Sequence, residues 1–451
     1  MMTTSKFSKS QADGQTIATN GSADRYLANL IAQREAIAPA TDLLAPLRAD
    51  AAERASLMSL PTMRDEDWRF TNLSSLKDVQ FAPADTGLTV VETNALDIPE
   101  ASATRLVFVN GQFSADLSDL SGVPDGVTVG NLASLSAEHQ QAIVERTSVD
   151  AMGQGDTFTL LNSTCMTDMA VVWVSKNAVV DTPIQIAFVS VSGSVPTVSH
   201  PRCAIVAERG SAVTVVEQFF GSGDSAYLTN TVTEIVLDNN AQLEHCKWQA
   251  EADNSFHVAR TAISQAKDSR YTGHTISTGG QLSRHSLETV QQGVNVRTTL
   301  NGLTIASNSQ ISDTHTAIDH ANPHGGSNQV HKCIVGDRAH TIFNGKVLVR
   351  PDAQKIDSSQ SSRNLLLSNK ARVDTKPQLE IFADDVKCAH GATVSQLVPD
   401  EVFYLRSRGL SKARAKQLLT YAFAAEAIDK ISVKSVADRL KAFAMTHSSF
   451  E

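Results

Sequence analysis

The sequence predicts a mainly β protein whose core is a right-handed parallel β-helix (β-solenoid), flanked by N-terminal and C-terminal α-helical domains. Between residues 158 and 396, short runs of β-branched and apolar residues are broken by Gly, Asn and Asp. The pattern continues without a break for longer than one β-sandwich, the main alternative, normally extends. The clearest runs are Ala170–Val174, Ile184–Val191, Ala212–Val216, Val232–Leu237, His257–Ile263, Thr298–Ile305 and Val347–Val349.

A weak internal repeat supports the solenoid. A polar turn residue is followed by a small or apolar residue and then by alternating apolar positions, at gaps clustering loosely near about 15 or 30 residues. Recurring spacing of this kind is typical of solenoid coils, which place a small residue at each corner. The turn marks stand at Asn177, Gly210, Asn240, Asn308, Arg338, Asp352, Lys370 and Asp385.

The two ends of the chain have helical patterns. Near the N-terminus, Tyr26, Leu27, Leu30 and Ile31 repeat at three- and four-residue spacing. Near the C-terminus, Ser411 is the expected N-cap of a helix, and another helix follows it. The predicted parts are a disordered tail (1–22), an N-terminal helical and mixed domain (23–157), the solenoid (158–396), and a C-terminal helical domain (397–451) with helices over 412–431 and 436–445.

The first C-terminal helix carries an apolar face formed by Leu418, Leu419, Ala422 and Phe423. Such a face must pack on something, and we expect most of it to lie against the neighbouring terminal helix. Terminal helices also commonly cap the open ends of a solenoid. The sequence therefore leaves two roles open for this region, a cap and a docking surface.

Composition excludes several classes of function. The formal net charge is −9, so no positive field favours a phosphate backbone, and nucleic-acid binding is not expected. No apolar run approaches the roughly 20 residues that span a bilayer, so no membrane association is expected. The five cysteines are scattered singly, as in a reducing compartment. We predict a cytoplasmic protein, or one of the plastid stroma if the tail is a transit peptide.

The segment Lys387–Thr393 contains the most informative pair of side chains, Cys388 and His390. In an extended strand, two residues at this spacing point to the same face. A thiol and an imidazole suit iron, zinc or copper, and a thiolate also accepts sulfur. The alternative is that the pair only packs, because Cys is among the most frequently buried residues.

Five histidines lie between residues 315 and 340, with Asp313 and Asp319 among them. His315, His320 and Asp319 could form the metal site of a hydrolase. Their spacing is not that of a helical metal pair, and hydrogen-bonded ladders along the coils explain them better. Nucleotide-binding motifs are missing: Gly345-Lys346 is followed by Val347, and no glycine-rich loop precedes it.

Several segments together resemble the SufB/SufD family of iron–sulfur cluster assembly proteins. They are Arg64–Leu73, His315–His324, Phe343–Leu367, Asp374–Ile381 leading into Cys388-Ala-His390-Gly-Ala-Thr, and Phe403–Leu410. The Cys-x-His-Gly-Ala-Thr form is similar to the SufD branch. The sulfur-accepting cysteine of the SufB branch is missing, because Ser361, Ser362 and Arg363 occupy its place. His331-Lys332-Cys333 departs from the family pattern, and the role of Cys333 stays open.

The resemblance implies a non-catalytic scaffold subunit that pairs with SufB through the solenoid and docks the SufC ATPase. His390, and Cys388 beside it, would supply ligands to a transient iron–sulfur cluster at the shared interface. Phe403, Arg406, Arg408 and Leu410 are the SufC-docking candidates it implies. A reduced flavin in the complex and a homodimer of the isolated chain are further expectations. The alternatives to the scaffold are a stand-alone metal-dependent hydrolase and a purely structural homodimer whose Cys-x-His pair only packs.

Overall fold

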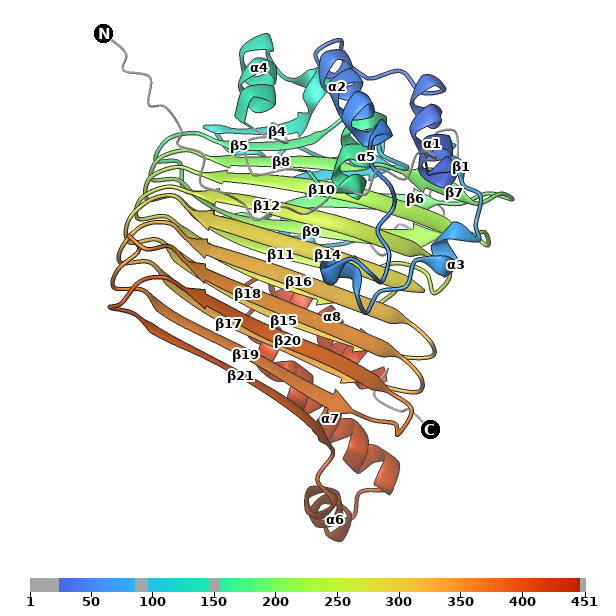
Figure 1. The fold of residues 1–451 in the computed structure, drawn as a ribbon, viewed down its shortest axis with the longest axis vertical. Coiled ribbons are helices and arrows are strands. Elements are labelled where there is room, and N and C mark those ends of the chain that lie inside the picture. The colour runs from blue at the N-terminus through green and yellow to red at the C-terminus, as the bar shows by residue number, and fades with distance from the viewer. Residues whose placement is uncertain (1–23, 86–95, 147–154, 447–451) are drawn as a thin grey trace.

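Two parallel sheets form the body of the protein (Figure 1). The computed structural model describes residues 24–85, 96–146 and 155–446, and the predicted tail 1–22 lies outside the described residues. The first sheet contains β1 (Ala82–Pro83), β4 (Val127–Asn131), β5 (Ala170–Val174), β7 (Thr197–Ser199), β8 (Arg202–Ala207), β10 (Tyr227–Leu237), β12 (Phe256–Gln265), β14 (Leu282–Gln291), β16 (Ile311–His320), β18 (His340–Val349) and β20 (Arg372–Ile381).

The second sheet lies behind the first, and from β8 onward successive strands of the chain alternate between the two (Figure 1). It contains β2 (Arg105–Val109), β3 (Gln112–Phe113), β6 (Ile184–Val191), β9 (Ala212–Ser222), β11 (Gln242–Ala250), β13 (Arg270–Ser277), β15 (Arg297–Ala306), β17 (Gly326–Val335), β19 (Asp357–Leu366) and β21 (Lys387–Gln396).

The strand register gives the length of a coil. Leu282 pairs with Ile311 and Ile311 with His340, so one coil takes 311 − 282 = 29 residues and the next takes 340 − 311 = 29. All ladders from β5 and β6 onward are parallel among the described strands, whereas β2–β3 and β4–β5 are antiparallel. The predicted β-solenoid is therefore confirmed.

Left-handed backbone conformations mark the corners of the coils. Asn177, Asn240 and Asn308 have φ of 62°, 57° and 55°, and Gly210 has φ of 73°. Asn and Gly tolerate this region better than other residues do, because Gly has no Cβ and the short Asn side chain bonds locally. The turn marks at these four positions are thus true corners.

The interior between the sheets changes character along the stack. In the early coils it is filled by apolar residues such as Val172, Ile205, Ile235 and Ile263, all fully buried. In the later coils polar side chains take over the inward positions, among them Gln291 and His320. Buried polar groups must find hydrogen-bond partners, so the late coils depend on side-chain networks rather than on apolar packing alone.

Helices cover the outer faces of both sheets instead of closing the end of the stack (Figure 1). Leu27, Leu30 and Trp68 pack on Leu228 and Phe256 of the first sheet. The N-terminal region contains α1 (Arg25–Ala32), η1 (Gln33–Glu35), α2 (Leu44–Ser56), η2 (Glu66–Trp68), α3 (Ser74–Lys77), η4 (Pro99–Ala101), η5 (Leu132–Ser134), α4 (Ala137–Arg146) and α5 (Thr157–Cys165).

The C-terminal helices are α6 (Pro399–Ser407), α7 (Lys412–Ile428) and α8 (Lys434–Thr446). Ile428 and Leu440 pack on Trp248 and Leu303, which belong to the outer face of the second sheet. Ser411 caps α7 as predicted, with Oγ accepting from the Arg414 backbone N–H at 3.2 Å. Helix α6 projects beyond the last coil (Figure 1).

The prediction for the apolar face of α7 is wrong. Leu418 and Ala422 are exposed and Leu419 and Phe423 only half-buried, whereas the buried face contains Ala415, Ala424, Ala427 and Ile428. Apolar residues surround most of this helix, so periodicity alone does not select a face. The alanine face lies against the sheet and leaves the larger side chains toward solvent.

Candidate interface at the open end of the solenoid

The last coil presents two open sheet edges. Strands β20 and β21 are the end members of their sheets, and no other described strand pairs with their outer edges. In a parallel strand, alternate residues direct their backbone N–H and C=O groups to opposite sides. The Lys387 N–H bonds at 2.8 Å to the carbonyl of Ile356, the residue before β19. The backbone groups of Cys388, His390 and Ala392 therefore face the open edge. Such an edge is ready to pair with another strand.

Cys388 and His390 lie on this last strand and share one face, as the alternation of a strand predicts. Cys388 pairs in register with Ser358, and His390 with Gln360. Because Ser358 and Gln360 are buried between the sheets, Cys388 and His390 continue two inward-facing columns. Cys388 is half-buried against the cluster of Val347 and Val349, and His390 is exposed because no coil follows it.

The thiol of Cys388 is protonated in the isolated chain. Burial raises its pKa, and the neighbouring Asp357 carboxylate raises it further. A thiolate is the form that binds metal or attacks sulfur. A role for Cys388 as a ligand therefore requires a positive charge, such as a metal ion, that replaces the proton.

A hydrogen-bonded ladder runs through the interior to the position below Cys388. The Gln265 Oε1 accepts from Thr298 Oγ1 at 2.6 Å, and Thr298 Oγ1 accepts from Gln291 Nε2 at 2.9 Å. His320 continues the ladder, with Nδ1 2.8 Å from Gln291 Oε1 and Nε2 3.0 Å from Ser327 Oγ. The last contact joins Ser327 Oγ to Ser358 Oγ at 2.8 Å. Buried polar residues thus fix one side of the final coils.

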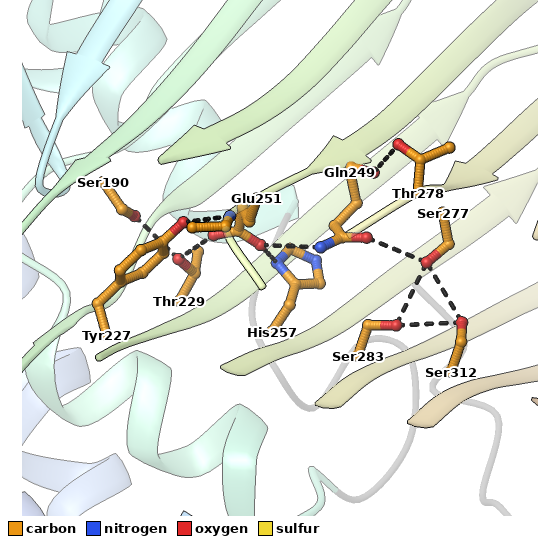
Figure 2. Close-up of polar contacts among 11 residues, drawn as sticks. Ser190, Tyr227, Thr229, Gln249, Glu251, His257, Ser277, Thr278, Ser283 and Ser312 are labelled. Carbon is orange, nitrogen blue, oxygen red and sulfur yellow. Dashed lines mark hydrogen bonds and ion pairs between the residues drawn. The ribbon is translucent and has the colours of Figure 1, made fainter. Parts of the chain in front are cut away.

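A second polar network crosses the interior of the middle coils (Figure 2). Glu251 accepts from Thr229 Oγ1 at 2.5 Å and lies 2.7 Å from Nδ1 of His257. Burial lowers the pKa of His257, although Glu251 opposes this shift. Ser277 Oγ donates to Gln249 Oε1 at 3.0 Å. The same hydroxyl lies 3.2 Å from Ser283 Oγ and 3.2 Å from Ser312 Oγ. These contacts satisfy buried polar groups and specify the register of the coils.

The alternative metal site at His315, Asp319 and His320 does not form among the described residues. His320 points into the interior ladder, whereas Asp319 lies on the outer face and binds Arg350 at 2.6 Å. His315 contacts Asp313, with Nε2 3.0 Å from Oδ1. No group of three or more His, Cys, Asp and Glu side chains that could hold a metal occurs among the described residues. Strand alternation places Asp319 and His320 on opposite faces, so the three side chains do not form one ligand set.

Asp313 instead anchors the N-terminal segment. Its carboxylate is buried, pairs with Arg284 and accepts from Thr71 Oγ1 at 2.5 Å. Burial alone would raise the pKa of Asp313, but Arg284 and His315 hold it at about 2. Arg284 also lies 3.9 Å from the centre of the Trp68 ring. Residue spacing gave no signal for these contacts, because they join segments more than 200 positions apart, with 313 − 71 = 242.

Cys333, whose role the sequence leaves open, is fully buried inside the late coils. Burial raises its pKa to about 12, although hydrogen bonds with Thr341 and Thr304 lower it. A protonated thiol that solvent does not reach is a poor nucleophile. The structure therefore places Cys333 in the packing of the interior.

The docking candidates lie on and beside α6. Phe403 is 70% exposed and Tyr404 57%, which is unusual for large apolar side chains and marks an interaction surface. Arg408 lies over the Tyr404 ring at 5.4 Å, and Leu410 is half-buried at the end of the helix. Arg406 is exposed and lines a groove beside the helix.

That groove has a volume of about 960 Å³ and lies between α6, α7 and the turns of the last coils. Asp337 is the one acidic residue among those that line it. Sequence reasoning missed the groove, because its cations come from three separate segments. They are Arg338, Lys370, Arg406, Lys412 and Lys416.

None of the helices in the described parts of the chain is both long and apolar enough to cross a membrane. Parallel coils, helices on both outer faces and one open coil edge define a β-solenoid protein. The SufBD core domain of the SUF system for iron–sulfur cluster assembly matches residues 188–423, and the SufBD N-terminal region matches residues 21–186. The chain belongs to the SufBD family of iron–sulfur cluster assembly proteins.

Named relatives agree with the family models. An iron–sulfur cluster assembly SufBD family protein of Synechocystis is 41% identical over 408 residues, covering 88% of this chain and 90% of the relative. The chloroplastic protein ABCI7 of Arabidopsis thaliana is 34% identical, covering 88% and 84%. The iron–sulfur cluster assembly protein SufD of Escherichia coli is 32% identical, covering 81% and 84%. The chain is therefore SufD-like, as the Cys-x-His-Gly-Ala-Thr segment predicts.

Proposed function

We propose that this chain is the SufD-type scaffold subunit of an iron–sulfur cluster assembly complex, pairing with SufB and docking SufC. The observation that carries the proposal is the open edge formed by β20 and β21. On β21, Cys388 and His390 are the last residues of two columns of inward-facing side chains. A strand of SufB added to this edge would bring its own side chains next to both. His390, and Cys388 once its proton is displaced, would then serve as ligands for the cluster that is assembled.

The nascent cluster is the cargo of such a complex and not a resident cofactor. Cys388 and His390 are the ligand-type side chains that continue the inward columns of the described coils, so we expect SufB to supply the remaining ligands. A second ligand set from the partner would also explain why the described residues lack a complete metal site of their own. In the isolated chain the same edge would pair with a second copy, which gives a homodimer.

Docking of SufC is assigned to Phe403, Arg406, Arg408 and Leu410. The support is the exposure of Phe403 and the position of Arg406 in a groove rich in cations. An aromatic anchor beside arginines is a common composition for the centre of a protein interface. A reduced flavin and a cytoplasmic or plastid location stay predictions. The name of the chloroplastic relative supports the plastid location.

A proline substitution tests the edge pairing. The Ala392 N–H faces the open edge, so Ala392→Pro removes an outward donor without breaking the bonds to β19. We expect the variant to fold, to retain SufC and to lose SufB in co-purification. Ala392→Val, which keeps the N–H, is the matched control and should retain both partners. Full SufB capture by the folded proline variant would contradict pairing through this edge.

A further inference from the structure

A second interior ladder ends directly below His390. Thr316 Oγ1 lies 2.8 Å from Gln329 Nε2, and Gln329 Oε1 accepts from Gln360 Nε2 at 2.9 Å. All three side chains are buried, with Gln360 only 3% exposed. Gln360 pairs in register with His390 on the next and last strand.

Gln360 has one polar atom left over. Its Nε2 donates to Gln329, and its Oε1 has no hydrogen-bond partner. A buried acceptor without a partner costs about 1–3 kcal/mol, so its presence calls for an explanation. The strand register makes His390 the next residue in the side-chain column of Gln360, and an imidazole N–H is a suitable donor.

The chain also makes room for Gln360 in this position. A Cβ on Gly345 would lie 1.9 Å from Gln360 Nε2, so no other residue fits at 345 while Gln360 holds its place. Gly345 faces the interior from the opposite sheet, within the Phe343–Leu367 segment. The side chain of Gln360 therefore depends on the absence of a side chain at Gly345, and it lies one strand before His390 in the same column.

We infer that Gln360 is a positioning residue for His390. When the exposed imidazole of His390 turns toward the interior, Gln360 Oε1 accepts the N–H of one of its nitrogens, which fixes the tautomer and leaves the lone pair of the other nitrogen free for a metal ion. Ligating histidines generally depend on such a partner, and its removal lowers metal affinity roughly 10–100-fold. This inference rests on the proposed role of His390 as a ligand.

The test compares two rungs of the same ladder. Gln360→Met removes the acceptor next to His390, whereas Gln329→Met removes the same groups one rung deeper. Nitrogen-15 NMR of the histidine rings reports the tautomer ratio in the full-length chain, and His390→Ala assigns the signal. We expect Gln360→Met to change the His390 tautomer ratio by about tenfold and Gln329→Met to leave it unchanged. Gln360→Ser, which withdraws the acceptor from the position next to His390, should shift the ratio in the same direction and covers the case in which the methionine variant fails to fold.

An unchanged ratio in Gln360→Met, or equal changes in both methionine variants, would overturn the inference. The measurement needs no assembled cluster, so it is independent of the proposed function. Iron content of the assembled complex supplies the second readout, with a roughly 10–100-fold loss of iron affinity expected for Gln360→Met only. If His390→Ala keeps full iron content while Gln360→Met shifts the tautomer, the proposed function fails and the positioning role stands.

Discussion

The guanidinium of Arg284 lies 3.9 Å from the centre of the Trp68 ring and pairs with the buried carboxylate of Asp313. Trp68 belongs to the N-terminal region, whereas Arg284 and Asp313 belong to neighbouring strands of the solenoid. A cation over an indole face is stabilising, and here the cation is also neutralised by a buried acid. These three side chains fasten the N-terminal segment to the outer face of the first sheet.

Loss of this fastening should destabilise the protein. Trp68 is only 9% exposed, and Trp68→Ala should lower the free energy of unfolding by about 3 kcal/mol, because it leaves a cavity and removes the cation–π contact. Urea denaturation measures the change. Leu57→Ala is the control, since Leu57 is 82% exposed and its truncation should be nearly neutral. Equal stability of the two variants would refute the role of Trp68.

Stability should fall in mild acid because of His320. Burial lowers the pKa of His320 to about 4, although Asp319 opposes the shift, whereas the unfolded chain has a value near 6.5. The unfolded state therefore binds more protons between pH 6.5 and pH 4, and stability is lost as the pH falls through this window. The loss is on the order of 3 kcal/mol for this group.

The His320→Gln variant checks that assignment, because glutamine cannot titrate. Its unfolding free energy should vary less with pH between 6.5 and 4 than that of the wild type. His324→Asn is the control, since His324 is exposed and its left-handed backbone, with φ of 62°, suits asparagine. An unaltered pH slope in His320→Gln would show that another group carries the dependence.

Docking of SufC should depend on Phe403. Phe403→Asp places a charge at the centre of the exposed aromatic surface and should weaken SufC retention at least tenfold, without changing the melting temperature. Leu57→Asp, at a still more exposed apolar position of the N-terminal region, is the matched control. Full retention of SufC by Phe403→Asp would show that SufC docks at a different surface. Truncation after Asp400 is a poorer test, because it uncovers Trp248 and Leu303.

The isolated chain should bind ATP only weakly and hydrolyse none. Gly345 and Lys346 have the Gly-Lys order of a phosphate-binding loop, but both lie within strand β18. Gly345 instead leaves space for the side chain of Gln360. Calorimetric titration with magnesium and ATP measures the binding. Stoichiometric, magnesium-dependent binding by the pure chain would contradict this expectation.

The solenoid was predictable because its signals are local. Asparagine and glycine corners such as Asn240 and Gly210 recur with strand alternation between them, and both depend only on residues close in sequence. The helix start at Ser411 was predictable for the same reason. The shared face of Cys388 and His390 follows directly from a strand period of two.

Other features depend on which residues become neighbours across coils, and one sequence does not contain that information. Asp319 and His320 look like joint ligands until strand alternation separates them. Gln360 carries no motif, and only the register of β19 with β21 places it below His390. The face of α7 that meets the sheet was also unpredictable, because small Ala424 and Ala427 allow a closer approach than Leu418 does.

The most direct test of the account is the iron and sulfide content of the complex co-expressed with SufB and SufC, with and without His390. We predict that His390→Ala folds, assembles with both partners and melts at the wild-type temperature, because His390 is exposed at the end of the stack. Its iron and sulfide content should nevertheless be severely reduced. Ser395→Ala, an exposed position on the same strand, should retain the full content. Wild-type iron and sulfide in the assembled His390→Ala complex would contradict the central claim.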